Sequence, residues 1–105
     1  MNDYCIVITT CANKEDARVV ILKLLEEKLA ACVQVVGINS WYTWKGSVNN
    51  EVECLLVIKT KKDLYQAVEE CILKNHKYEV PEIIQVPIEA GFVKYLSWID
   101  EVTGK

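Results

Sequence analysis

The sequence contains few of the residues that build common catalytic, metal-binding and phosphate-binding sites. Its 105 residues include a single histidine, a single methionine, one phenylalanine and four glycines. It has no Cys-x-x-Cys pair, no HExxH motif and no glycine-rich loop that cradles a phosphate. Carboxylates are numerous, but none forms an isolated pair between apolar residues, the setting in which acid–base catalysis is tuned. We therefore expect a protein that is not an enzyme.

An excess of positive charge and a long apolar run are also absent. Lysine and arginine number 12 against 15 aspartates and glutamates, so the formal net charge is −3, whereas binding a nucleic-acid backbone needs a basic face. No run approaches the roughly 20 apolar residues of a membrane helix. The five cysteines are odd in number and follow no zinc or disulfide spacing, which favours reduced thiols. We expect a cytoplasmic protein with no nucleic-acid partner and no membrane insertion.

Apolar residues are plentiful enough for one folded domain spanning residues 1–105. They make up 51% of the chain against 26% charged residues, a composition that excludes a disordered polymer. A chain of this mass buries about two-thirds of its surface on folding. No repeat, linker or low-complexity segment divides it.

Apolar periodicity predicts seven elements along the chain. Four segments have the character of strands and three have the apolar spacing of helices: strands 4–10, 32–44, 48–59 and 82–88, and helices 14–30, 64–75 and 92–102. The first six, in order, form the split βαβ pattern of a ferredoxin-like fold. We therefore expect an α+β sandwich in which one antiparallel sheet has two helices on one face, followed by a short C-terminal helix.

Local signals predict where several elements begin and end. Asn13 is expected to cap the first helix, and Thr60, with Asp63 three residues later, is expected to cap the second. The turn between the second and third strands is expected at residues 45–46, with residues 49–50 as the alternative centre.

The hairpin formed by the second and third strands is too long for its domain. The 13 residues of 32–44 span roughly 43 Å as a strand, whereas a domain of this size is roughly 35 Å across. The overhang carries Trp41, Tyr42 and Trp44, and exposed aromatic rings on unpaired strands are what a stable monomer avoids. We expect a homo-oligomer with these three residues in its interface; stacking on a planar ligand is the alternative role.

Four stretches of the sequence resemble the divalent-cation-tolerance (CutA) family. They are Glu27-Lys28-Leu29-Ala30-Ala31-Cys32-Val33, Ser40-Trp41-Tyr42-Thr43-Trp44-Lys45-Gly46, Asn75-His76-Lys77-Tyr78-Glu79-Val80-Pro81-Glu82-Ile83 and Tyr95-Leu96-Ser97-Trp98-Ile99. These stretches follow the family's order and spacing, and they are distributed over residues 27–99, so the resemblance extends over most of the chain. The resemblance implies a homotrimer similar in shape to the PII signalling proteins, with a role in divalent-metal tolerance or copper handling.

The resemblance also implies a metal site. Copper-binding members use a cysteine at the end of the first strand and a histidine just after the second helix, and Cys11 and His76 occupy these positions. The chain departs from the family at Lys77, where proline is usual, and at Asn75, where some bacterial members have a second histidine. A thiolate and an imidazole suit copper(I) or zinc, and two ligands fall short of the four of structural zinc, so copper is the expected metal.

The alternative roles of these two residues are a structural thiol and a solvated or capping imidazole. The position of Cys11 before a helix N-terminus predicts a lowered pKa and a reactive thiol.

The alternative function is a PII-like small-ligand sensor, or a protein-interaction scaffold, that binds partners at clefts between subunits. The residues expected to line such a cleft are Trp44, Lys59, Tyr78 and Glu82, with Glu53 on the same strand face as Lys59. Salt-bridged structural residues are the alternative interpretation of the charged members of this set.

Overall fold

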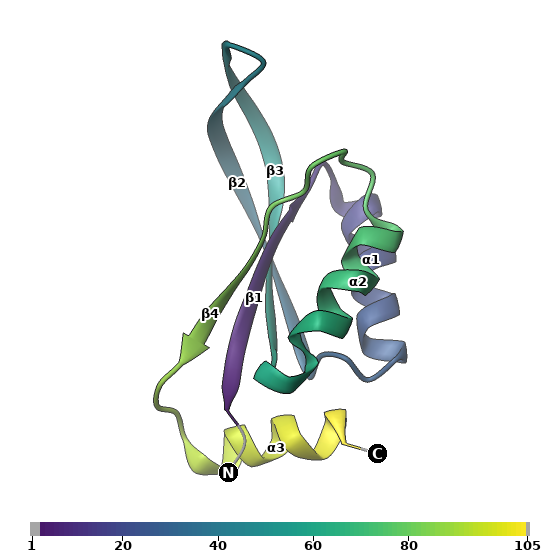
Figure 1. The fold of residues 1–105 in the computed structure, drawn as a ribbon, viewed down its shortest axis with the longest axis vertical. Coiled ribbons are helices and arrows are strands. Elements are labelled where there is room, and N and C mark those ends of the chain that lie inside the picture. The colour runs from purple at the N-terminus through teal and green to yellow at the C-terminus, as the bar shows by residue number, and fades with distance from the viewer. Residues whose placement is uncertain (1–2, 105) are drawn as a thin grey trace.

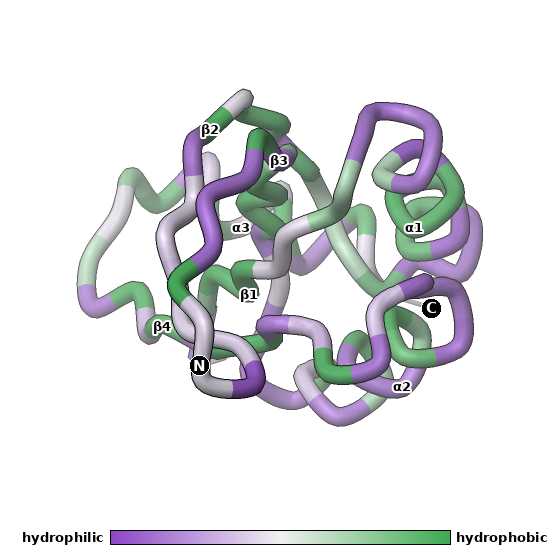
Figure 2. The backbone as a smooth tube through the Cα atoms, turned by 90° about the horizontal axis from the view of Figure 1, so that it is seen from above, coloured by the Kyte–Doolittle hydropathy of each residue, from purple (hydrophilic) through white to green (hydrophobic). Residues whose placement is uncertain are grey.

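The computed structural model describes residues 3–104 and confirms the predicted order of elements (Figure 1). The elements are β1 (Tyr4–Cys11), α1 (Lys14–Glu26), β2 (Cys32–Trp44), β3 (Ser47–Lys61), the 3-10 turn η1 (Lys62–Leu64), α2 (Tyr65–Asn75), β4 (Ile83–Ile88) and α3 (Val93–Thr103). The strands form one antiparallel sheet in the order β2-β3-β1-β4. Figure 2, viewed along the long axis, shows α1 and α2 together on one side of this sheet. This is the predicted ferredoxin-like sandwich.

The hydrophobic core lies between the sheet and the two helices. Alternate residues of β1 and β3 point into it, as the burial pattern of each strand shows. Its fully buried side chains include Cys5, Val7, Leu56 and Ile58 from the strands and Val20, Leu24, Val68 and Ile72 from the helices. All five cysteines of the described chain are free, and four of them are buried. None of the helices within residues 3–104 is both long enough and apolar enough to cross a membrane.

Helix α1 begins as predicted but ends four residues earlier. Its cap is Asn13, whose side-chain oxygen accepts a hydrogen bond of 2.8 Å from the backbone N–H of Asp16. At the other end, Lys28 has a φ of +57°. The N–H of Leu29 bonds the carbonyl of Leu24, and that of Lys28 bonds Leu25. This is a Schellman motif with lysine in the left-handed position that usually takes glycine.

The predicted capping role of Thr60 is wrong. β3 continues to Lys61, so Thr60 lies in the sheet, fully buried, and its hydroxyl donates a 2.7 Å hydrogen bond to the carbonyl of Leu29. It therefore satisfies a carbonyl just beyond the end of α1 and takes no part in starting the next helix. Helix α2 follows the η1 turn, with no side-chain cap found among the described residues.

The hairpin turns at Lys45-Gly46, the first of the two predicted positions. The register pairs Trp44 with Ser47, and the two residues between them have φ values of +51° and +80°. Positive φ at both central positions is the type I′ turn that matches the twist of a two-residue hairpin.

The overhang of this hairpin is confirmed. β1 pairs with β3 only as far as Cys11 opposite Cys54, so β3 beyond that point is bonded to β2 alone. The described molecule measures 45 × 26 × 21 Å, and Figure 1 shows the hairpin projecting past the other elements along the long axis. Trp41, Val48 and Val52 are 72–75% exposed there. The chain by itself covers little of this apolar surface.

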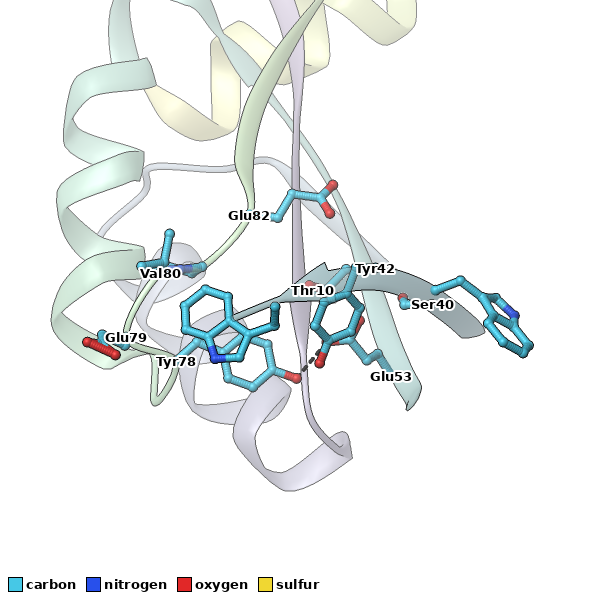
Figure 3. Close-up of a pocket in the computed structure, with 11 residues that line it drawn as sticks. Thr10, Ser40, Tyr42, Glu53, Tyr78, Glu79, Val80 and Glu82 are labelled. Carbon is cyan, nitrogen blue, oxygen red and sulfur yellow. Dashed lines mark hydrogen bonds between the residues drawn. The ribbon is translucent and has the colours of Figure 1, made fainter. Parts of the chain in front are cut away.

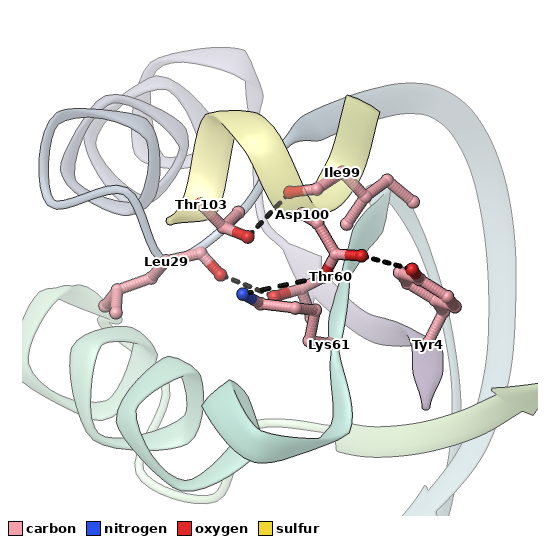
Figure 4. Close-up of polar contacts among 7 residues, drawn as sticks. All are labelled: Tyr4, Leu29, Thr60, Lys61, Ile99, Asp100 and Thr103. Atoms are coloured by element: carbon pink, nitrogen blue, oxygen red, sulfur yellow. Dashed lines mark hydrogen bonds and ion pairs between the residues drawn. The ribbon is translucent and has the colours of Figure 1, made fainter. Parts of the chain in front are cut away.

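Helix α3 packs at the opposite end of the sheet through a small polar cluster (Figure 4). The Tyr4 hydroxyl donates to the Asp100 carboxylate, and Lys61 Nζ lies 3.8 Å from the same group. Ile99 is fully buried, which anchors the helix beside this cluster. The face of the sheet away from α1 and α2 stays largely uncovered, with Val36, Ile84 and Val86 exposed by 40–49%.

Candidate functional site

Cys11 and His76 lie together at the hairpin end of the sheet, although 65 residues separate them. Cys11 is the last residue of β1, and His76 follows the last residue of α2. The Cys11 Sγ atom is 3.7 Å from Nε2 of His76. The topology causes this contact, because the end of β1 and the C-terminal end of α2 reach the same end of the molecule (Figure 1).

Both ring nitrogens of His76 have backbone partners. Nε2 lies 2.6 Å from the carbonyl oxygen of Thr10, and Nδ1 accepts a 3.1 Å hydrogen bond from the N–H of Tyr78. A carbonyl only accepts, so the neutral ring carries its proton on Nε2. The ring also packs against Tyr78, with centroids 4.8 Å apart. His76 therefore ties the segment after α2 to the end of β1.

The Cys11 thiol is not activated, contrary to the prediction from its place before a helix. Its pKa is raised to about 11, mainly by burial and in smaller part by the charges of Asp16, Cys54 and Glu53. Cys11 is only 1% exposed, and it lies opposite Cys54 on the core side of the sheet. The carboxylates in the first turn of α1 also oppose the helix dipole that was expected to favour the thiolate.

The two donors fit a soft metal ion with few ligands. With ordinary bond lengths, a metal ion holds a sulfur and a nitrogen ligand about 3.5 Å apart when it is tetrahedral and about 4.3 Å apart when these two ligands are in line, so the 3.7 Å between Cys11 and His76 lies between the two arrangements. Across residues 3–104, no group of three His, Cys, Asp or Glu residues is placed to hold a metal ion. One chain therefore offers two ligands, which suits copper(I) better than a structural zinc ion.

Lys77, where the chain departs from the family's usual proline, forms a surface ion pair. Its Nζ atom lies 3.0 Å from Asp16 on α1, and the lysine side chain is 76% exposed. Exposed pairs of this kind contribute about 0–1 kcal/mol. The pair adds a second, weaker link between the segment after α2 and the helix layer.

A cleft of about 610 Å³ lies beside this contact, between the hairpin and residues 78–82. Three of the four residues predicted for a ligand cleft line it: Trp44, Tyr78 and Glu82. Trp41 and Tyr42, predicted for an interface, line it too. The side chains labelled in Figure 3 come from β1, β2, β3 and the segment 78–82.

Lys59, the fourth predicted cleft residue, lies elsewhere. Its Nζ atom is 5.7 Å from the centroid of the Tyr95 ring on α3. β3 is long enough to separate its two ends, since Lys59 pairs with Ile6 near the start of β1 whereas Glu53 lies beyond the end of β1. In a single chain, the strand face that the two residues share does not bring them into one site.

Glu53 and Tyr78 form the polar wall of the cleft. Glu53 is only 7% exposed, and its Oε2 accepts a 2.5 Å hydrogen bond from the Tyr78 hydroxyl (Figure 3). Burial, followed by this hydrogen bond, raises the pKa of Tyr78 well above its ordinary value. Sequence reasoning missed several other lining residues, namely Thr10, Ser40, Glu79, Val80 and Pro81. The last three lie between Tyr78 and Glu82, which were both predicted to line the cleft, so the sequence could have indicated the whole segment 78–82.

The split βαβ sandwich, its overhanging hairpin and the cysteine–histidine contact define a ferredoxin-like α+β protein with a candidate site at the hairpin end. Comparison with known proteins identifies the family to which this protein belongs. The family model described as CutA1 divalent ion tolerance protein matches residues 5–102. The chain belongs to this family, which is named for tolerance to divalent ions and not for a reaction.

Individual relatives agree in sequence and structure. The chain is 44% identical to Protein CutA 1, chloroplastic, of Oryza sativa over 93% of its length, and 41% identical over 94% to the divalent-cation tolerance protein CutA of Thermus thermophilus. It covers 56% of the rice protein and 97% of the Thermus protein. The crystal structure of CutA1 from Oryza sativa superposes with a TM-score of 0.95, at 42% identity and with 99% of this chain and 96% of that one covered. The chain thus spans about half the length of the plant relatives that it matches.

Proposed function

We propose that the chain is a homotrimeric, cytoplasmic divalent-cation-tolerance protein in which Cys11 and His76 bind copper. The observation that carries the metal site is the 3.7 Å separation of Cys11 Sγ and His76 Nε2. The soft donor set favours copper(I), which accepts few ligands. Five free cysteines support a reducing compartment. Catalysis is not part of this function.

Binding at this site changes the protons and hydrogen bonds of both residues. The thiol releases its proton, because the thiolate is the ligand. Nε2 of His76 becomes a ligand only when its proton moves to Nδ1, and the ring then gives up the bonds to Thr10 and Tyr78. Each such bond contributes about 0.5–1.5 kcal/mol. Metal uptake is thus coupled to release of the segment after α2. The lost hydrogen bonds lower the affinity for the metal, and the released segment changes conformation when the metal binds.

The overhanging hairpin supports the homotrimer. β2 is an edge strand along its whole length, and it carries exposed apolar side chains that one chain cannot cover. Trp41, Tyr42 and Trp44 are exposed by 38–72% on the part of the hairpin that overhangs. Pairing with neighbouring copies gives hydrogen-bond partners to the free backbone groups of the β2 edge, and it buries these rings. The number three comes from the family resemblance.

Copper(I) affinity of variants tests the metal site. In a competition titration against a chromogenic chelator, Cys11→Ser and His76→Ala should each lower the affinity by more than about 100-fold, the upper range for loss of an outer-shell partner. Cys32→Ser removes a partly exposed thiol elsewhere and serves as the matched control. Equal affinity for the parent and for both site variants would contradict the assignment.

A second candidate function, a small-ligand sensor, is favoured by the 610 Å³ cleft. A metal ion needs far less space, whereas pockets for small molecules typically measure 300–1,000 Å³. A thermal-shift series on the purified oligomer tests it, since any compound that binds the folded state raises the melting temperature. If no class of compound raises it, the sensor function is wrong.

A further inference from the structure

Cys11 and Cys54 lie directly opposite each other in the sheet. The register of β1 on β3 pairs them at the hairpin end of that ladder. Directly opposed side chains point to the same face of a sheet, with Cβ atoms about 4.5–5.5 Å apart. Both residues belong to the hydrophobic core, where they are 1% and 7% exposed. Their arrangement is therefore set inside one chain and does not depend on how copies assemble.

The spacing of this pair fits a disulfide. Opposed residues of antiparallel strands have Cα atoms about 4.5 or 5.5 Å apart, and disulfides join Cα atoms that are about 4.4–6.8 Å apart. The Cβ atoms must approach by at most about 1 Å, and the pair ends its ladder, where a strand is least constrained. In the registers of the described strands, no other two cysteines lie opposite each other.

Cys54 is the thiol that a small oxidant reaches first. It is the more exposed of the two, and its neighbour on β2 is Gly37, which adds no side chain beside it. The pKa of Cys11 is raised to about 11, so little of this residue is the reactive thiolate at neutral pH. Cys11 suits a second, intramolecular step, because a reacting atom held next to it makes up for a small thiolate fraction.

We propose that hydrogen peroxide converts Cys11 and Cys54 to a cross-strand disulfide, which withdraws Cys11 from the copper site. The Cys54 thiolate attacks one peroxide oxygen, the O–O bond breaks, and the sulfur becomes a sulfenic acid. The Cys11 thiolate then attacks that sulfur, so that the S–S bond forms, the S–O bond breaks and water leaves. Together the two thiols lose two electrons and two protons, and the peroxide becomes two water molecules.

The effect on copper rests on the proposed function. Copper(I) is bound by a thiolate, and the oxidised chain keeps only His76 of the two ligands. The imidazole then retains its hydrogen bonds to Thr10 and Tyr78, so the segment after α2 stays held against β1. Disulfides in a reducing compartment are usually transient and redox-sensing. Oxidation thus stops copper uptake until a thiol reductant restores the pair.

Peptide mass mapping tests the disulfide without copper. The reduced full-length protein is treated with hydrogen peroxide, its remaining thiols are alkylated, and it is denatured and digested with trypsin without a reductant. Cleavage after lysine leaves Cys11 in peptide 1–14 and Cys54 in peptide 46–59. We expect these two peptides to be joined, with a mass lower than their sum by two hydrogen atoms. Peptide 1–14 also contains Cys5, so the same link should form in Cys5→Ala.

Variants connect the disulfide to copper binding. In an anaerobic titration against a chromogenic copper(I) chelator, peroxide treatment should weaken binding to the parent by more than about 100-fold, as Cys11→Ser does. Cys54→Val places a good strand former at the same position, and it should bind copper(I) like the parent both before and after peroxide. Cys71→Ala removes another buried thiol and is the matched control, which should lose affinity as the parent does. If Cys54→Val does not assemble, Cys54→Ala replaces it.

The outcomes separate the disulfide from the metal site. After peroxide treatment, the absence of a link, a link between other cysteines or a link between two copies would overturn the proposal. It would also be overturned if a protein that carries the Cys11–Cys54 bond kept its copper affinity while Cys11→Ser had lost it. If Cys11→Ser binds copper as tightly as the parent, the proposed copper site is wrong, and the mass map still decides whether the disulfide forms.

Discussion

The hydrogen bonds of His76 predict that its imidazole stabilises the fold even without metal. His76→Ala removes the 2.6 Å bond to the Thr10 carbonyl and the 3.1 Å bond from the Tyr78 N–H. It also removes the ring packing at 4.8 Å. Two hydrogen bonds at about 0.5–1.5 kcal/mol each, with about 0.5–1.5 kcal/mol for the ring pair, sum to about 1.5–4.5 kcal/mol.

Urea unfolding with a copper chelator present measures this loss. The chain concentration is held fixed, because the stability of an oligomer depends on it. Lys77→Ala, which removes only the exposed pair with Asp16, is the neighbouring control and should change the unfolding free energy by less than about 1 kcal/mol. If the unfolding free energy of His76→Ala lies within about 0.5 kcal/mol of that of the parent, the His76 contacts that link the segment after α2 to β1 do not form in solution.

Three further predictions concern the fold. Lys28→Gly should raise the unfolding free energy by about 0.5–1 kcal/mol, because glycine adopts the φ of +57° without the left-handed penalty; a lower urea midpoint would refute the Schellman ending. Thr60→Val should cost about 1–3 kcal/mol by leaving the Leu29 carbonyl unpaired, whereas Thr60→Ser should retain most of the stability in the same assay. Burial raises the pKa of Cys5 from 9.0 to about 11, so the unfolded chain loses this proton first and stability should fall as the pH rises from about 9 to 11, by at most about 2.7 kcal/mol. Cys5→Ala should show a shallower decline, measured by urea midpoints across that pH range.

Most of the fold was predictable from apolar spacing. The two predictions that were wrong, the end of the first helix and the role of Thr60, have local causes. The first helix was expected to reach residue 30, because no glycine marks its end. The chain instead stops the helix with Lys28 in the left-handed conformation, which a sequence pattern does not reveal. Thr60 resembles a cap in sequence, but the sheet extends through it and uses its hydroxyl for the Leu29 carbonyl.

The candidate site was predictable only in part. Cys11 and His76 were identified through the family resemblance, and the topology brings them into contact. The partners of the His76 ring are backbone atoms of Thr10 and Tyr78. Backbone groups of this kind are common to nearly all residue types, so the sequence does not indicate these hydrogen bonds. The burial that raises the pKa of Cys11 is a tertiary property, so the position of the thiol before a helix pointed to the wrong reactivity.

Native mass spectrometry of the reduced protein, with and without stoichiometric copper(I), tests the central proposal most directly. It reads the number of chains and the number of bound ions in one spectrum. We predict an assembly of three 12.0 kDa chains that takes up three copper ions and loses them in Cys11→Ser and His76→Ala but not in Cys32→Ser. A monomer, or an assembly whose copper content is the same in all four proteins, would contradict it.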